Sequence, residues 1–170
     1  MLLPDSEPAA MPGQLDDDDR RYLRMAVELS RSYRGDPRRG PFGAIVAGQG
    51  KVLGRGFNQV VELRDPSAHA EIMALRAAAR ARDRHVLEDC TLYSSSEPCP
   101  MCLAACYWAS VPRVVFAATS LDLAGYDFPD LAFYTELGLP AERRSMREDA
   151  DGEEIRREAL LAVQDWAQHR

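Results

Sequence analysis

The chain has 170 residues, 46% of them hydrophobic, which is enough for a single globular domain with a substantial core. Its formal net charge of −6 disfavours a nucleic-acid substrate over most of the surface, although it does not exclude a local basic patch. The start, Met1-Leu2-Leu3-Pro4, resembles neither a signal peptide nor a membrane anchor, and the 4 cysteines then indicate a reducing compartment, so we expect a cytoplasmic protein with no membrane association.

The N-terminal part of the chain predicts a lead followed by a helix. Residues 1–14 mix Pro, Gly, Ser and Ala, which predicts a disordered lead before a folded domain over residues 15–170. Asp16 to Asp19 place acidic side chains where a helix begins, ahead of apolar residues at helical spacing. Successive aspartates in a first turn are more often solvated caps than metal ligands, so we interpret this run as a helix start.

A hairpin and a helix come next. Residues 42–47 form an apolar run of strand length, and residues 51–57 alternate into a second strand. The short turn Gly48-Gln49-Gly50 between them predicts an antiparallel hairpin. A helix follows over residues 69–82, and either Asp65 or Ser67 is positioned to cap it.

The second half of the sequence predicts a third and a fourth strand and three helices, and it leaves a place for a fifth strand. A third strand covers residues 91–95, and a helix continuing through Trp108 joins it to a parallel fourth strand over residues 113–118. A short helix is expected over residues 131–137, and the apolar face formed by Ile155, Ala159, Leu160, Val163 and Trp166 predicts a closing helix. Between these helices, residues 142–154 are highly charged, and Met146 marks the place where a fifth strand fits.

The chemistry is concentrated in two short motifs. Cys99 and Cys102 have the spacing that lets one metal ion take both thiolates, and they come just after a strand, where open α/β sheets place ligands. His69 is preceded by turn residues and followed by a helix-forming run. Cys90 and Cys106 form no second close pair, so a closed four-ligand structural site is disfavoured. We therefore predict one zinc ion per chain, held by these three ligands with a fourth position for water.

Glu71 indicates what that water does. It follows His69 by two residues, so both side chains can border one pocket in the first turn of a helix while the carboxylate stays free. A carboxylate beside an activated water can take its proton and later deliver it to a leaving group. The combination His-x-Glu with Pro-Cys-x-x-Cys is the signature of the zinc deaminases, and Pro98 completes it.

Further segments resemble the bacterial guanine deaminase branch of the cytidine deaminase superfamily. The similarity spans roughly residues 20–168 and includes Phe42-Gly43-Ala44, Asn58, the segments 65–71 and 97–103, Tyr107-Trp108-Ala109, and Gly125-Tyr126-Asp127 leading to Tyr134. It implies an α/β fold, a three-layer αβα sandwich with a central five-stranded mixed sheet, and usually a homodimer. It also implies substrate contacts by Phe42, Asn58 and His69, with Ala70 next to them, and an acidic side chain that binds the base and moves protons. Trp108, at helical spacing from Cys102, is expected either at the pocket edge or in the core or a dimer interface.

Three departures from the branch bear on the substrate. Ser96 stands where a Cys is common, and the usual Gly-Phe-Asp-Asp is expanded to the six residues 125–130. Asp130 keeps the spacing to Tyr134, but Asp127 also fits the acidic position, so both are candidates. The tail ends at Gln168-His169-Arg170 without the terminal aromatic residue of some members.

The sequence therefore predicts a zinc-dependent hydrolase that removes an amino group from a small heterocyclic ring, with guanine to xanthine plus ammonia as the first choice. Glu71 is the predicted acid and base, assisted by Asp130 or Asp127. The alternatives are a tRNA adenosine deaminase, which the acidic balance disfavours, a deaminase of another purine, pterin, triazine or nucleoside, and a non-enzymatic zinc module. His85 and His169 are expected to be solvated, and Cys106 to be a buried thiol.

Overall fold

The computed structural model describes residues 15–150 and 152–169, so the predicted lead over residues 1–14 lies outside it. The chain divides into two compact units, the first ending at Phe133 and the second starting at Tyr134, and each is described by itself. Among the described helices, none has the length and apolar character that crossing a membrane requires.

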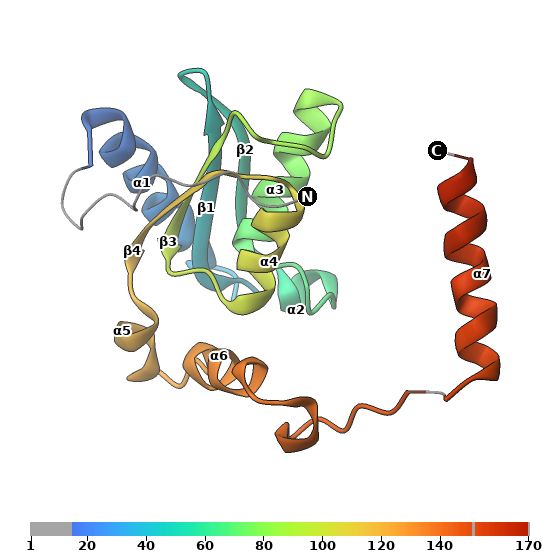
Figure 1. Cartoon of the computed structure of the whole chain (residues 1–170). Helices are drawn as coiled ribbons and strands as arrows, with labels where there is room; N and C mark the ends of the chain where they lie inside the picture. The colour runs from blue at the N-terminus through green and yellow to red at the C-terminus, as the bar shows by residue number, and fades with distance from the viewer. Residues whose placement is uncertain (1–14, 151, 170) are drawn as a thin grey trace. The chain divides into compact units, whose positions relative to one another are not determined.

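The first unit is built on a mixed sheet of four strands in the order β2-β1-β3-β4 (Figure 1). Its strands are β1 (Gly40–Gly48), β2 (Lys51–Asn58), β3 (Thr91–Ser96) and β4 (Arg113–Ala118). β1 runs antiparallel to both β2 and β3, whereas β3 and β4 are parallel. The predicted hairpin and the predicted parallel pair are both confirmed.

The predicted fifth strand is wrong for the part of the chain that the structure describes. The 3-10 turn η2 (Ala141–Arg143) occupies the start of this segment, and no strand follows it up to residue 150. Met146 is 74% exposed. A strand needs an apolar face to bury against its sheet, and one methionine among consecutive charged side chains does not provide one.

Helices cover both faces of the sheet, which gives the expected three layers. α1 (Asp17–Ser30) lies on one face, where its Tyr22 and Ala26 pack with Ile45, Tyr93 and Val115. α3 (Ala70–Arg82) and α4 (Pro100–Trp108) lie on the other face, where they share a core with Ala44, Val46 and Leu92. The alternation of β1 residues between the two cores is the period of two that a sheet buried on both faces requires.

α3 packs closely against β2 because glycines and alanines meet there. A β-carbon at Gly56 would lie 2.1 Å from the carbonyl oxygen of Ala70, and one at Gly54 would lie 2.1 Å from that of Ala74. Ala70 and Ala74 are themselves fully buried. Since neither layer has room for a larger side chain, the start of α3 is fixed relative to the sheet.

The predicted cap of α3 is wrong. The residue at the N-cap position is His69, and its side chain makes no capping hydrogen bond. The carboxylate of Asp65 instead accepts hydrogen bonds from the backbone N–H of Ser67 at 2.8 Å and from its hydroxyl at 2.6 Å. Asp65 thus orders the turn before the helix, and the imidazole of His69 remains available for another partner.

The remaining elements are short, apart from the last helix. They are η1 (Arg31–Tyr33), α2 (Val60–Leu63), α5 (Ser120–Ala124), α6 (Asp130–Gly138) and α7 (Glu154–Gln168). α6 and α7 confirm the two helices predicted in this region. The apolar residues of α7 are exposed in the chain, including Ile155 at 65% and Trp166 at 60%.

Asp19 has a structural role that its place in an acidic run did not predict. It is 3% exposed, and its carboxylate accepts hydrogen bonds from both terminal nitrogens of Arg113 at 2.7 Å each. The hydroxyl of Tyr93 donates a further bond at 2.9 Å. These contacts join α1 to β3 and β4. The pKa of Asp19 is lowered, chiefly by the hydrogen bonds from Arg113.

The lowered pKa of Asp19 predicts a pH-dependent contribution to stability. Because the folded-state pKa lies below the unfolded value, the contribution is present above the ordinary pKa of 3.8 and is lost as the pH falls through the folded value. Asp19→Asn should lower the free energy of unfolding at pH 7 by about 2 kcal/mol, the size of a hydrogen bond to a charged group. In urea denaturation, the difference in free energy of unfolding between this variant and the unaltered protein should become smaller as the pH is lowered from 7 to 3.

The matched control is Asp17→Asn, because Asp17 lies in the same helical turn with a fully exposed side chain. This change should leave stability the same within a few tenths of a kcal/mol. An equal loss in both variants, or a gap for Asp19→Asn that does not depend on pH, would contradict the assignment.

Candidate active site and metal centre

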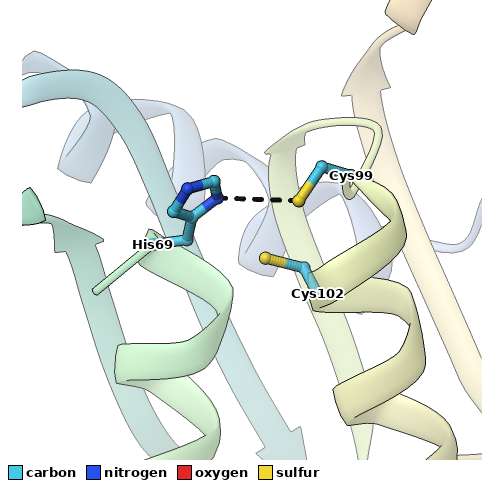
Figure 2. A group of neighbouring side chains, drawn as sticks. All are labelled: His69, Cys99 and Cys102. Carbon is cyan, nitrogen blue, oxygen red and sulfur yellow. Dashed lines mark hydrogen bonds between the residues drawn. The ribbon is translucent and has the colours of Figure 1, made fainter. Parts of the chain in front are cut away.

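Three predicted ligands come together where α3 and α4 begin. His69 is the N-cap residue of α3, Cys99 is the N-cap residue of α4, and Cys102 lies in the first turn of α4. Figure 2 shows the imidazole and the two thiols pointing toward one another. The Nδ1 atom of His69 lies 3.7 Å from the Sγ atom of Cys99, and one ligand atom from each of the three residues lies within 4.8 Å of the others.

The chain around Cys99 is fixed by backbone geometry and by a tie to the next strand. Pro100 occupies the first position of α4, where a missing N–H costs nothing. The backbone N–H of Glu97 donates to the carbonyl oxygen of Ala118 at 2.7 Å, and the Glu97 carboxylate accepts from the backbone N–H of Ser120 at 2.8 Å. The loop between β3 and α4 is therefore anchored at the end of β4.

The electrostatic surroundings favour a thiolate at Cys99. Its pKa is lowered to about 4, chiefly by a hydrogen bond from Cys102 and also by His69. The same bond, together with burial, raises the pKa of Cys102. Because the thiolate is the form that ligates metals, a cation held by both sulfurs would require both to be deprotonated.

The donor set fits zinc. An imidazole nitrogen and two thiolates are ligands that zinc prefers, and a three-ligand set is typical of catalytic rather than structural sites. The other two cysteines, Cys90 and Cys106, are buried free thiols outside this group. Burial raises the pKa of Cys106 to about 12, which confirms the expectation of an inert buried thiol.

Glu71 lies beside the ligands on the first turn of α3 and is 4% exposed. Its Oε1 atom accepts a hydrogen bond from the hydroxyl of Ser94 at 3.1 Å, and its Oε2 atom accepts one from the thiol of Cys102 at 3.5 Å. Burial raises the pKa of Glu71 above its ordinary value of 4.5. A buried carboxyl with a raised pKa is able to hold and release a proton nearer to neutral pH.

The sequence did not single out Ser94, the partner of Glu71. It is fully buried in β3, and the next residue, Ser95, accepts a hydrogen bond through its hydroxyl from the backbone N–H of Gly43 at 3.1 Å. The available signal was the run Ser94-Ser95-Ser96 at the end of a buried strand. Polar residues in such a place require partners, which here come from α3 and β1.

The structure separates the two candidate aspartates. Asp130 is half-buried, and its pKa is raised by burial and then by the charge of Cys99, with His69 acting in the opposite direction. Asp127 is exposed and has a left-handed backbone conformation with φ of 61°. Asp130 is therefore the aspartate whose charge is felt at the ligand group.

The other predicted contact residues occupy different surroundings. Phe42 is half-buried in β1, and Ala70 is fully buried in α3. Trp108 ends α4 and is 86% exposed, so in the chain itself it is not part of the core. His85 and His169 are exposed, which confirms that they are solvated.

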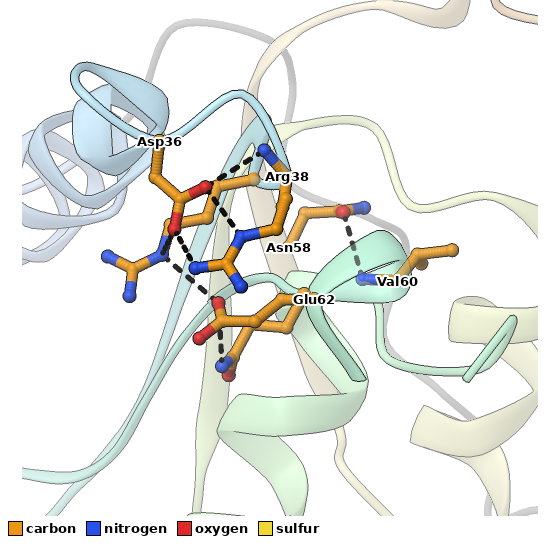
Figure 3. A network of polar contacts seen from close by, with 7 residues as sticks. Asp36, Arg38, Asn58, Val60 and Glu62 are labelled. Atoms are coloured by element: carbon orange, nitrogen blue, oxygen red, sulfur yellow. Dashed lines mark hydrogen bonds and ion pairs between the residues drawn. The ribbon is translucent and has the colours of Figure 1, made fainter. Parts of the chain in front are cut away.

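Asn58 ends β2, and a network of charged side chains lies next to it (Figure 3). Its Oδ1 atom accepts from the backbone N–H of Val60 at 3.4 Å. The carboxylate of Glu62 accepts from Arg39 at 3.1 Å and from the side chain of Gln59 at 3.3 Å. The guanidinium of Arg39 also lies 4.6 Å from the centre of the Phe57 ring. These contacts hold α2 against the end of β2.

The same segment is tied to the zinc ligand. The backbone N–H of Gln59 donates to the carbonyl oxygen of Ala68 at 2.9 Å, so the residue after Asn58 is bonded to the residue before His69. Asn58 is also paired with Gly40 across the hairpin, and a β-carbon at Gly40 would lie 2.9 Å from the Asn58 amide. The backbone and the glycine together fix where the amide of Asn58 lies.

The fold and the site define a class of protein, the zinc-dependent hydrolases with one His and two Cys ligands and a free glutamate beside them. Residues 16–118 match the model of the cytidine and deoxycytidylate deaminase zinc-binding region, and the chain belongs to this family. The protein is a zinc-dependent hydrolytic deaminase.

Individual relatives give a finer comparison. The guanine deaminase of Bacillus subtilis is 42% identical over 125 residues, which cover 74% of this chain and 80% of that protein. Its crystal structure superposes with a TM-score of 0.82 and 36% identity, covering 91% of this chain and 95% of that one. The tRNA-specific adenosine deaminase of Aquifex aeolicus is 41% identical over 99 residues, covering 57% of this chain and 64% of that protein. A crystal structure of NE0047 with 2,6-diaminopurine is 36% identical and superposes with a TM-score of 0.62, covering 67% of this chain and 63% of that one.

Proposed function

We propose that this protein deaminates guanine hydrolytically to xanthine and ammonia. The observation that carries the proposal is the extent of the similarity to the Bacillus subtilis guanine deaminase, whose structure covers 91% of this chain with a TM-score of 0.82. The match to the tRNA-specific adenosine deaminase covers 57% of the chain. The guanine deaminase match thus extends beyond the metal motifs, toward the segment that contains Asp130.

His69, Cys99 and Cys102 are the residues that would hold the zinc. Zinc, when bound there, supplies a Lewis acid that lowers the pKa of water toward neutrality. Ligation requires Cys102 to be deprotonated, which removes the S–H donor to Oε2 of Glu71, while Ser94 still donates to Oε1. Oε2 is therefore the oxygen free to exchange a proton.

Glu71 moves the proton during the reaction. Its carboxylate takes a proton from the water that attacks the ring carbon bearing the amino group, and it delivers that proton to the adjacent ring nitrogen. It then takes the proton of the hydroxyl group now on that carbon and gives it to the amino group, which leaves as ammonia while the C=O bond of the product forms. The same carboxyl thus acts as base and as acid in both steps. The burial that raises its pKa suits both steps, because a carboxyl with a pKa nearer neutrality is a better base and remains able to donate.

We assign the substrate contacts to three side chains, as the family resemblance implies. Phe42 provides a face for stacking on the base, and Asn58 provides an amide held by the segment next to His69. Asp130 places a carboxylate near the ligand group, where it can accept hydrogen bonds from ring N–H groups and from the amino group. Ala70 and Trp108 border this region in the same scheme. Homodimer formation and a cytoplasmic location stay predictions.

A tRNA adenosine deaminase is the second candidate, because several curated relatives carry that activity in their names. Such an enzyme needs a basic surface for RNA, and the net charge of −6 disfavours it.

Ammonia release from zinc-loaded protein should be measured with guanine, adenine, cytosine, 2,6-diaminopurine, a pterin and a triazine, alongside an assay for inosine in tRNA. We expect the highest kcat/KM with guanine. Inosine formation without ammonia from any free base would contradict the proposal.

The choice between the two aspartates gives a separate prediction. Asp130→Asn should lower kcat/KM for guanine by about a hundredfold or more, an effect of general acid–base size, with zinc content unchanged. Asp127→Asn, three residues away and exposed, should lower it less than threefold, as expected for a solvated surface side chain. If the Asp127 variant is inactive and the Asp130 variant is not, the two assignments are exchanged. Full activity of both variants would show that neither aspartate of this segment takes part in the reaction.

A further inference from the structure

An aromatic side chain lies next to the proposed stacking residue and has no part in the scheme above. The ring of Phe128 packs against the ring of Phe42 with centroids 4.9 Å apart and an interplanar angle of 80°. This is the edge-to-face arrangement that aromatic pairs prefer. Phe128 is half-buried, whereas the residues on either side of it, Asp127 and Pro129, are exposed.

The backbone of this segment determines which side chains turn inward. Asp127 has a φ of 61°, a left-handed conformation that residues other than glycine seldom adopt. The carbonyl oxygen of Pro129 accepts from the backbone N–H of Phe133 at 3.1 Å, which starts α6. Phe128 and Asp130 are consequently half-buried, and the residue between them faces solvent.

The two inward residues of this segment face two parts of one site. Asp130 interacts electrostatically with Cys99 and His69. Phe128 contacts Phe42, and the residue after Phe42 is bonded through Ser95 to the strand that carries Ser94, the partner of Glu71. A series of contacts therefore runs from Phe128 through Phe42 and the residue after it to β3, the strand that carries Ser94.

We propose that Phe128 is a positioning residue for the substrate: its edge-to-face contact with Phe42 fixes the plane of the Phe42 ring and so the face on which the base stacks. This inference rests on the proposed function for the role of Phe42. Stacking stabilises a bound base whether or not the reaction proceeds, so loss of Phe128 should weaken binding more than it slows the chemical step. The expected signature is a raised KM with little change in kcat.

The test uses zinc-loaded full-length protein. Phe128→Ala should raise KM for guanine and the Kd for 8-azaguanine, measured by calorimetry, by about fivefold to tenfold, as expected for the loss of one aromatic pair. Its kcat should change less than threefold and its zinc content should stay the same, while its Tm should fall by only a few degrees, as expected for the loss of one aromatic pair. Phe128→Tyr keeps the aromatic ring and should have the same KM for guanine and the same Kd for 8-azaguanine as the unaltered protein. Phe133→Ala is the matched control, because Phe133 lies in α6 and is 51% exposed; it should change neither.

A double-mutant cycle with Phe42→Leu separates positioning from a general structural role. If Phe128 acts through Phe42, the Phe128→Ala change should have little further effect on Kd when Phe42 has already been replaced. Additive effects of the two changes would overturn the inference, as would an unaltered Kd in Phe128→Ala, or a fall in kcat without a change in KM.

The binding readout keeps this inference distinct from the proposed function. Binding of 8-azaguanine without turnover of guanine would contradict the guanine deaminase proposal while still allowing the comparison of Phe128 variants. If another base proves to be the substrate, the same comparison is made with that base, and equal KM values in the two proteins would again overturn the role of Phe128.

Discussion

The site depends on how closely α3 lies against β2. Gly54 and Gly56 let the carbonyl oxygens of this helix approach the strand to a distance that no β-carbon permits, and the alanines of α3 complete the contact. The helix therefore cannot shift along or away from the sheet without breaking its tightest packing. The start of α3, where His69 and Glu71 lie, is held at one end of the sheet. The start of α4, which follows β3 and contains Cys99 and Cys102, lies at the same end (Figure 1). The metal ligands come from segments 30 residues apart, and this packing brings them within reach of one another.

At this site, the pKa values of two neighbouring groups are shifted in opposite directions. The pKa of Cys99 is lowered by the hydrogen bond from Cys102 and by His69, so it is available as a thiolate. The pKa of Glu71 is raised, chiefly because the carboxyl is buried. One group thereby becomes a better metal ligand and the other a better proton carrier. Ser94 restrains one oxygen of Glu71 and leaves the other for proton exchange, which gives this buried polar side chain near the end of β3 its partner.

The sequence predicted much of this arrangement because its strongest signals are local. The spacing of Cys99 and Cys102 and the position of Glu71 after His69 define the ligands, and apolar periodicity located each of the four strands. What it missed depends on contacts between distant segments. Asp19 looked like a solvated cap until Arg113 and Tyr93 were placed beside it, and Ser94 gave no sign of its partner on α3. The fifth strand was implied by the family resemblance and was placed at a single methionine in a charged segment, a pattern too weak to support a strand. The backbone turn that leaves Asp127 exposed and Asp130 half-buried, which favours Asp130 as the reactive aspartate, was likewise not visible in the sequence.

The central claim is that Glu71 carries the proton and does not hold the metal. It is tested most directly by Glu71→Gln, which keeps the size of the side chain and an oxygen that can accept from Ser94 but cannot carry a proton. The account predicts one zinc per chain by atomic absorption and an unchanged Tm, with kcat lowered by a factor of about a hundred to ten thousand. Cys99→Ala, in comparison, should lose zinc. Loss of zinc from Glu71→Gln, or a kcat close to that of the unaltered protein, would contradict the account.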